Sequence, residues 1–504
     1  MLRLAAVFCS VLLLSCASNK IIVRDRQVAP SPGKSGPLKA LEERALPGAG
    51  SAFKLLEVNS DGLQWRLALI DSAQHSLDLM TFIWWGDESG ELVLKRVIDA
   101  ADRGVKVRLI VDDMSTIDDG KGLKLRDLPN AALDSHPNIE LRVFNPWTNR
   151  EAVGRAVEFI GDFKRLNQRM HNKALIADNR VAIMGGRNLG NEYFGLNPTF
   201  NFQDVDVLSV GPATRQVSGV FDAYWNSEWV VPQAQLAQTV APEALKTERA
   251  ELVARLRAAT TLEQFPLDPK DWSAELAALQ LHPGTSNVIT DTPEKGSLDH
   301  HMPAMVGELW KNAQKEVLVA NAYIIPDEAV FKRTAEELKP GVRFVMLTNS
   351  LASTDAAGVH AHYTEWRPRM VAGGVELYEL KHDAKVRSQI VDTKPVEAGF
   401  MGLHAKVMVV DRSRVLIGSM NLDPRSWVHN TEMGMLIDCP ALATELGAVI
   451  DRNLAAENAW RIALDGSGQV TWVSGQEVRR TAPAREEGQR REEMIHLLLP
   501  ADLY

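Results

Sequence analysis

The feature that most constrains this chain of 504 residues is an internal repeat. In the first part of the chain, helix-like runs alternate with strand-like runs, and a glycine precedes a strand of buried type; the same order returns in the second part. The matching stretches, first copy before second, are 76–85 with 317–325, 104–112 with 341–349, and 139–144 with 375–380. Because the two copies keep a nearly constant separation, the repeat predicts an α/β fold class with two similar halves.

A single motif closes each half. In both copies lysine follows histidine by two residues, aspartate by seven, glycine by 14 and asparagine by 17. The two copies are His171, Lys173, Asp178, Gly185, Asn188 and His404, Lys406, Asp411, Gly418, Asn421. Of the 12 histidines, only His171 and His404 share such a duplicated context, which favours a catalytic role over that of a satisfied polar residue on a strand.

The spacing of the motif has a physical reason. Residues two apart on a strand face the same side, so histidine and lysine project together while the apolar run after lysine anchors the strand. A second strand, at 181–184 or 415–417, brings the asparagine back alongside. Each half therefore offers an imidazole, an ammonium and an amide.

On these residues the chain resembles the phospholipase D superfamily, whose signature is H-x-K-x4-D followed by G-G/S-x-N. The resemblance covers nearly the whole chain after residue 50. It implies two similar phospholipase D-like α-β-α sandwich halves with the active site at their interface. We expect these halves at 51–232 and 300–504, joined by a connector at 233–299.

The resemblance also implies a reaction at phosphorus. One histidine attacks the phosphodiester and becomes a phosphohistidine, while the other protonates the departing alcohol and then deprotonates the incoming water or alcohol. Resemblance alone assigns His171 as the nucleophile and His404 as the acid and base, since the sequence is symmetric on this point. Because two ammonium groups are available, we expect no metal ion and no other cofactor.

Phosphoryl oxygens need positive charge and hydrogen-bond donors around them. The residues expected to hold these oxygens are Lys173, Lys406, Asn188 and Asn421. The second copy has Ser419 where the first has Gly186, so only one half can offer a hydroxyl to the phosphate.

A catalytic histidine works best when a carboxylate accepts a hydrogen bond from its other nitrogen, which fixes the tautomer. Glu432 follows the second motif at the head of a strand, and by family resemblance it would orient His404. In the first half Asp204 is the best counterpart for His171, with Asp206 as the close alternative.

The two motif aspartates, Asp178 and Asp411, belong to the catalytic signature. We expect them to hold turns near the strand ends rather than to carry protons.

The N-terminus is typical of an export signal. Arg3 precedes an apolar stretch, 4–14, that is too short to span a bilayer, and the next residues resemble a bacterial lipobox that ends at Cys16. We expect a lipoprotein signal at 1–16, lipidation of Cys16 and a flexible tether at 17–50, with a plain secretory signal as the alternative. The chain would then be anchored in the bacterial cell envelope and face the periplasm, with a leaning toward the outer membrane.

Several further stretches resemble bacterial cardiolipin synthases, in particular their C-type branch: 100–105, 139–146, 187–194, 224–226 and 355–360. These enzymes move a phosphatidyl group from one phospholipid to the headgroup hydroxyl of another, so the expected partners are phospholipids in a bilayer.

Three rival functions remain open. A hydrolytic phospholipase D would use the same residues with water as the acceptor. A phosphodiesterase acting on DNA is disfavoured, because the formal net charge of −9 provides no overall basic field for nucleic acid. A non-catalytic envelope lipid-binding lipoprotein is disfavoured by the two intact motifs.

The end of the chain carries no motif. The stretch 476–491 is dense in arginine and glutamate and predicts a mobile tail or a solvated helix, and the apolar run 497–500 is expected to pack back onto the body.

Overall fold

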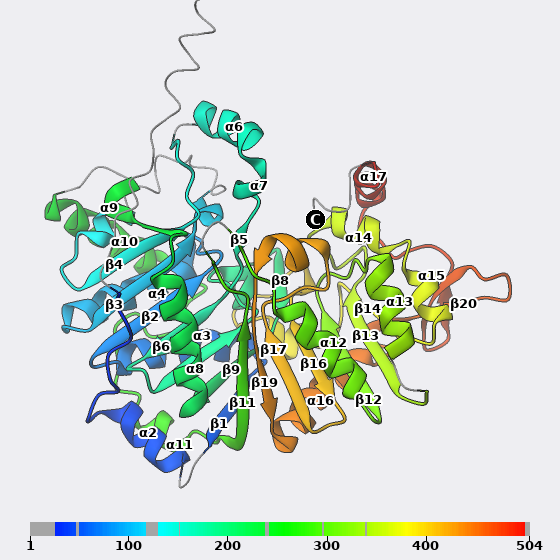
Figure 1. Ribbon diagram of the computed structural model, residues 1–504, viewed down its shortest axis with the longest axis horizontal. Coiled ribbons are helices and arrows are strands. Elements are labelled where there is room, and N and C mark those ends of the chain that lie inside the picture. Colours follow the sequence, from blue (N-terminus) through cyan, green and yellow to red (C-terminus); the bar gives the residue numbers. More distant parts are fainter. Residues whose placement is uncertain are drawn as a thin grey trace, which may run out of the picture.

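The two halves lie side by side, each built on a twisted sheet (Figure 1). The computed structural model describes residues 26–46, 50–116, 130–150, 152–236, 241–294, 297–337 and 340–498. The predicted signal 1–16, with Cys16, lies outside these residues. None of the helices in the described ranges combines the length and apolarity needed to cross a bilayer.

The sheet of the first half contains three parallel strands, β2, β3 and β4, while every other pairing in it is antiparallel. In spatial order its strands are β10 (Val230–Pro232), β4 (Ile139–Phe144), β3 (Lys106–Asp112), β2 (Ser76–Thr81), β6 (Ala174–Ala177), β7 (Val181–Gly185), β9 (Asp206–Val210) and β1 (Ser51–Leu56).

The second half repeats this plan, with β12, β13 and β14 as its parallel strands. Its order is β19 (Met433–Asp438), β17 (Arg414–Gly418), β16 (Lys406–Val410), β12 (Glu316–Asn321), β13 (Arg343–Asn349), β14 (Glu376–Leu380), β20 (Ala459–Leu464), β21 (Val470–Ser474) and β22 (Glu477–Arg479). The predicted fold class is confirmed.

Helices cover both faces of each sheet, which is why the central strands are apolar on both sides. One face of the first sheet packs against α3 (Asn59–Ser72) and α4 (Glu88–Asp102), and the corresponding face of the second packs against α12 (Met302–Asn312) and α15 (Arg367–Ala372). The other faces share one core with α8 (Pro212–Trp225) and α16 (Pro440–Leu454). This shared core holds the halves together.

A glycine precedes the second parallel strand of each half, as predicted, and in the first half it ends a helical segment. Gly104 follows α4 at φ +96° and Gly341 follows α13 (Glu328–Glu337) at φ +87°, a left-handed conformation that other residues rarely adopt.

The range predicted as a connector does more than join the halves. Two of its helices, α10 (Pro242–Ala258) and α11 (Ser273–Ala278), pack on the first half. Its strand β11 (His282–Thr290) pairs with β1 through its first residues and with β19 through the rest, so the two sheets form one continuous surface.

The described part of the predicted tether, residues 26–46, contains a helix that packs on the first half. Helix α2 (Pro37–Ala45) places Leu38 and Leu41 three residues apart on one face, where both are buried against the first half. The backbone N–H of Ala29 also donates to Asp222 at 2.8 Å.

The C-terminal stretch forms β22 and the helix α17 (Glu487–His496), which packs on α14 (Ala357–Tyr363). The apolar residues that follow do not return to the body, because Leu498 is 84% exposed. The expectation that they pack back is therefore wrong for the described residues.

Candidate active site

The two motif histidines lie at the same edge of the continuous sheet. His171 follows β5 (Arg169–Met170) and leads into β6, and His404 follows β15 (Phe400–Leu403) and leads into β16. Since β6 and β16 run antiparallel to β2 and β12, their first residues lie beside the carboxyl ends of those parallel strands. Both histidines are buried, with 6% and 5% of their surface exposed.

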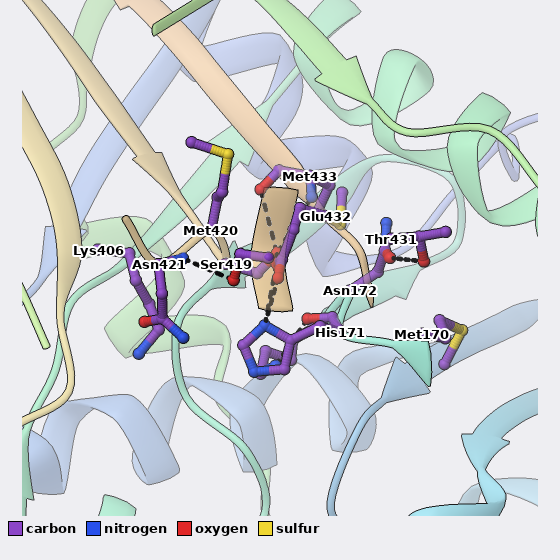
Figure 2. Close-up of polar contacts among 12 residues, drawn as sticks. Met170, His171, Asn172, Lys406, Ser419, Met420, Asn421, Thr431, Glu432 and Met433 are labelled. Atoms are coloured by element: carbon purple, nitrogen blue, oxygen red, sulfur yellow. Dashed lines mark hydrogen bonds and ion pairs between the residues drawn. The ribbon is translucent and has the colours of Figure 1, made fainter. Parts of the chain in front are cut away.

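Each histidine is hydrogen-bonded to a carboxylate from the opposite half. His171 Nδ1 donates to Glu432 at 3.0 and 2.9 Å (Figure 2), and His404 Nδ1 donates to Asp204 at 2.6 Å. The sequence selected the correct carboxylates, but the predicted pairing within each half is wrong. The alternative, Asp206, faces neither histidine and instead pairs with Arg66 and Arg187.

Two short parallel strand pairs between the halves cause this exchange. Strand β18 (Asn430–Thr431) pairs with β5, and β8 (Phe200–Gln203) pairs with β15. The N–H of His171 donates to Thr431 O at 2.9 Å, and that of His404 donates to Gln203 O at 2.8 Å. The residue directly after each of these partner strands is the carboxylate, Glu432 or Asp204, so each carboxylate faces the histidine of the other half.

The motif lysines are buried in the same centre. Lys173 Nζ donates to His171 O at 2.6 Å, and Lys406 Nζ donates to His404 O. Burial lowers the pKa of Lys173 to about 7 and that of Lys406 to about 8. In each case the negative charges of Glu432 and Asp204 raise the lysine pKa and so offset part of the effect of burial.

The contacts between the halves build one site, in which each histidine lies within the electrostatic influence of both lysines. Burial lowers the pKa of His171 and of His404 well below the ordinary value, and the charges of Lys173 and Lys406 lower each of them further. Burial also raises the pKa of Glu432 to about 8 and raises that of Asp204. The buried centre therefore favours neutral imidazoles.

The downstream motif residues lie beside the histidines but differ in their contacts. Asn421 is buried, and its Oδ1 has no hydrogen-bond partner among the residues described, whereas Asn188 Oδ1 accepts from Ile83 N at 3.3 Å. Figure 2 shows Lys406 and Asn421 on the side of the site that the second half supplies.

The hydroxyl of Ser419 does not point to a free phosphate position. It donates to Glu432 Oε2 at 2.5 Å, so it supports the carboxylate of His171 (Figure 2). The matching Gly186 has no room for a side chain, because a Cβ there would lie 2.3 Å from Asp204 Oδ1. The predicted phosphate contact of Ser419 is replaced by a contact with Glu432.

The motif aspartates hold turns, as predicted, and lie away from the histidines. The carboxylate of Asp178 accepts from the backbone N–H groups of residues 74, 75 and 76, and that of Asp411 from those of residues 314, 315 and 316. Both aspartates adopt φ 53°, which fits a tight turn between two strands. Each therefore ties a motif hairpin to the start of β2 or β12.

Sequence reasoning missed the aromatic side chains that enclose the centre. Phe82 lies edge-on to His171 with ring centroids 5.1 Å apart, and Tyr193 lies edge-on to His404 at the same separation. Lys173 lies 5.3 Å from the Phe82 ring and Lys406 lies 5.7 Å from that of Tyr323. The sequence does place an aromatic residue, Phe82 or Tyr323, just after the first parallel strand of each repeat, and this repetition could have identified them.

Sequence reasoning also missed Arg425, on the π-helical turn η4 (Arg425–His429). Its Nη1 donates to Asn167 Oδ1 at 3.0 Å, and its charge is one of those that, after burial, lower the pKa of His171. No motif marks this residue.

Comparison with known proteins identifies the family. The family model described as "Cardiolipin synthase, PLD-like domain" matches residues 67–225 and 307–454. Cardiolipin synthase C of Escherichia coli strain K12 is 35% identical over 438 residues, which cover 85% of this chain and 89% of that protein. An uncharacterized protein of Helicobacter pylori strain 26695 is 32% identical over 82% of this chain and 81% of its own length.

A solved structure supports the fold independently. The phosphatidylserine synthase of Haemophilus influenzae Rd KW20 superposes with a TM-score of 0.54 at 13% identity, over 83% of this chain and 91% of that one. The paired motifs, the two-half fold and these matches agree. The chain belongs to the family of cardiolipin synthase PLD-like proteins, within the phospholipase D superfamily.

Proposed function

We propose that this protein is a phospholipid phosphatidyltransferase that makes cardiolipin from two phospholipids through a phosphohistidine intermediate. The observation that carries the proposal is the crossed arrangement of the centre: each half supplies one imidazole and one ammonium, and each imidazole is held by the carboxylate of the other half. The similarity to cardiolipin synthase C supports the substrate class.

The proposed first step is attack by His171. With Nδ1 held by Glu432, its Nε2 carries the lone pair that bonds to phosphorus. The bond from phosphorus to the leaving alcohol breaks, and His404 gives that alcohol its proton. The choice of His171 as nucleophile follows the family resemblance.

The second step reverses the first. His404 takes the proton from the headgroup hydroxyl of a second phospholipid, whose oxygen attacks phosphorus as the bond to His171 breaks. Throughout, the ammonium groups of Lys173 and Lys406 would face the phosphoryl oxygens, helped by the amides of Asn188 and Asn421. The negative charge of a bound phosphodiester raises the pKa of nearby cationic groups, which would restore the charge of both lysines and favour protonation of His404.

The test is to give the purified protein phosphatidylglycerol alone and then with phosphatidylethanolamine, and to identify the lipid products. Cardiolipin is the expected product, and a chelator should leave its yield unchanged. Phosphatidic acid as the sole product would mean that water is the acceptor, and this result would overturn the transferase proposal. Because the bond between phosphorus and histidine hydrolyses in acid, the reaction is quenched in alkali before the covalent adduct is analysed. The adduct is expected on His171.

We also propose that lipidation of Cys16 anchors the chain in the bacterial envelope, facing the periplasm. Labelling of cells with a fatty-acid analogue should mark the protein, and Cys16→Ser should abolish the label. Label that persists in Cys16→Ser would contradict the anchor.

A further inference from the structure

Large apolar side chains are exposed on a small number of segments. Among the described residues, those with more than a third of their surface exposed include Val157 (67%), Phe163 (39%), Val428 (58%), Met494 (61%), Ile495 (62%), Leu497 (42%) and Leu498 (84%). We call these seven the rim residues. They lie on α6 (Ala152–Gly161), α7 (Phe163–Leu166), η4 and the end of α17 with the two residues after it.

Helices α6 and α7 and the turn η4 leave the sheet at the edge that carries the active site, and α17 reaches this edge by packing on α14. Helices α6 and α7 follow the carboxyl end of β4, and η4 follows β17, whose last residue adjoins Ser419. Helix α14 follows the carboxyl end of β13 and carries α17 on it. In Figure 1, α6, α7, η4 (orange), α14 and α17 accordingly occupy the same upper end of the molecule.

Polar contacts fix these segments to the centre. Arg425 of η4 donates to Asn167 beside α7 at 3.0 Å, and its charge acts on His171. Glu493 of α17 pairs with the buried His360 of α14 at 2.6 Å. Just before α14, Asp355 accepts from Tyr323 OH at 2.7 Å, beside His404. The segments that carry the rim residues are therefore tied by polar contacts to residues near the two histidines.

We propose that the rim residues form a surface that inserts into the boundary between the headgroups and the acyl chains of a phospholipid bilayer and delivers lipid phosphates to the buried histidines. The proposal rests on the phospholipid substrates proposed above. A bilayer accepts apolar side chains from separate segments, whereas a protein partner requires a contiguous and complementary patch. Exposed Lys164, next to Phe163, suits the phosphates of the headgroup layer.

Apolar insertion, and not net charge, drives this docking. The chain carries a formal net charge of −9, so long-range attraction to anionic lipids is not available to it. The orientation on the bilayer should therefore persist at high salt, which screens exposed charges.

The test places an environment-sensitive thiol label at rim positions of the full chain by Val428→Cys and Leu498→Cys. The matched control is Val478→Cys on the outermost strand β22, because Val478 is 59% exposed and Val428 is 58% exposed. The unsubstituted protein, treated identically, supplies the background of the native thiols. All variants are bound to vesicles of phosphatidylcholine and phosphatidylglycerol, with and without brominated acyl chains.

Bromine quenching at positions 428 and 498, but not at 478, is the expected result. An absence of quenching at the rim, or equal quenching at 478, would overturn the proposal. Because the readout reports which face meets the bilayer, an N-terminal anchor alone cannot produce it.

A second measurement separates this surface from the reaction. Val428→Glu with Leu498→Glu should raise the apparent KM for vesicle lipids by roughly tenfold or more, because charges are disfavoured in the apolar layer. Turnover of a water-soluble phosphodiester should be unchanged, and Val478→Glu should change neither. An unchanged KM in the rim variant would count against the surface. Rim quenching without any phosphatidyl transfer would support the surface and contradict only the proposed function.

Discussion

Glu432 and Asp204 accept one hydrogen bond each from a histidine of the other half, and this contact sets which imidazole nitrogen is free to react. An amide in place of the carboxylate can donate to Nδ1 and so favour the unproductive tautomer. Glu432→Gln and Asp204→Asn should each lower kcat by about 10³-fold. Ser419→Ala, which removes only the hydroxyl that supports Glu432, should lower kcat by about 10- to 100-fold, as expected for one lost hydrogen bond to a charged group.

The crossing itself is visible to nitrogen NMR of histidine-labelled protein. Glu432→Gln should move the ring resonances of His171 and leave those of His404 in place, with assignments taken from the two histidine-to-alanine variants. A shift confined to His404 would mean that the carboxylates pair within the halves.

The lysines predict how phosphate binding depends on pH. Burial lowers the pKa of Lys173 to about 7 and that of Lys406 to about 8, so each loses its proton, and its charge, as pH rises through these values. A non-reactive phosphonate analogue should bind progressively more weakly from about pH 6 to 9, with proton uptake on binding at the alkaline end. In Lys406→Met the dependence should be shallower, because one titrating cation is gone. If the phosphonate analogue had the same inhibition constant across this pH range, the lysine charges would not control phosphate binding in this way.

At the scale of elements, the two motif hairpins offer a matched comparison. Asp178 is buried and Asp411 is half-buried, yet each accepts from three consecutive backbone N–H groups. Asp178→Ala should lower the free energy of unfolding by about 2–4 kcal/mol and Asp411→Ala by about 1 kcal/mol, because water can replace the lost acceptor only where it has access. Urea unfolding measures this. The folded fraction of each variant should keep its activity to within a few-fold, and loss of activity without loss of stability would instead indicate a chemical role.

The same hairpins show what can be predicted from sequence. Their histidine, lysine and aspartate were predictable because strand geometry puts alternate residues on one face, and the repeat doubled the signal. The partners of the histidines were not, because β5 and β18 contain two residues each and carry no periodicity. Nothing local in Thr431-Glu432 shows that it pairs with Met170-His171 from the other half.

For the whole molecule, the repeat predicted two similar halves, but sequence could not show how they are joined. Strand β11 lies in the range expected to be the connector, and it links β1 to β19. The shared core under α8 and α16 is likewise invisible in either repeat alone, because each half's inner face looks like an ordinary apolar strand surface. These long-range contacts place the two histidines in one centre.

The most direct test of that single centre is the activity of His171→Ala and of His404→Ala, measured separately and after mixing. One shared centre within each chain predicts that both variants fall below about 10⁻³ of the unsubstituted rate, and that mixing them restores nothing. If either variant kept about half of the activity, each repeat would house its own complete site, and a single centre shared by the two halves would be excluded.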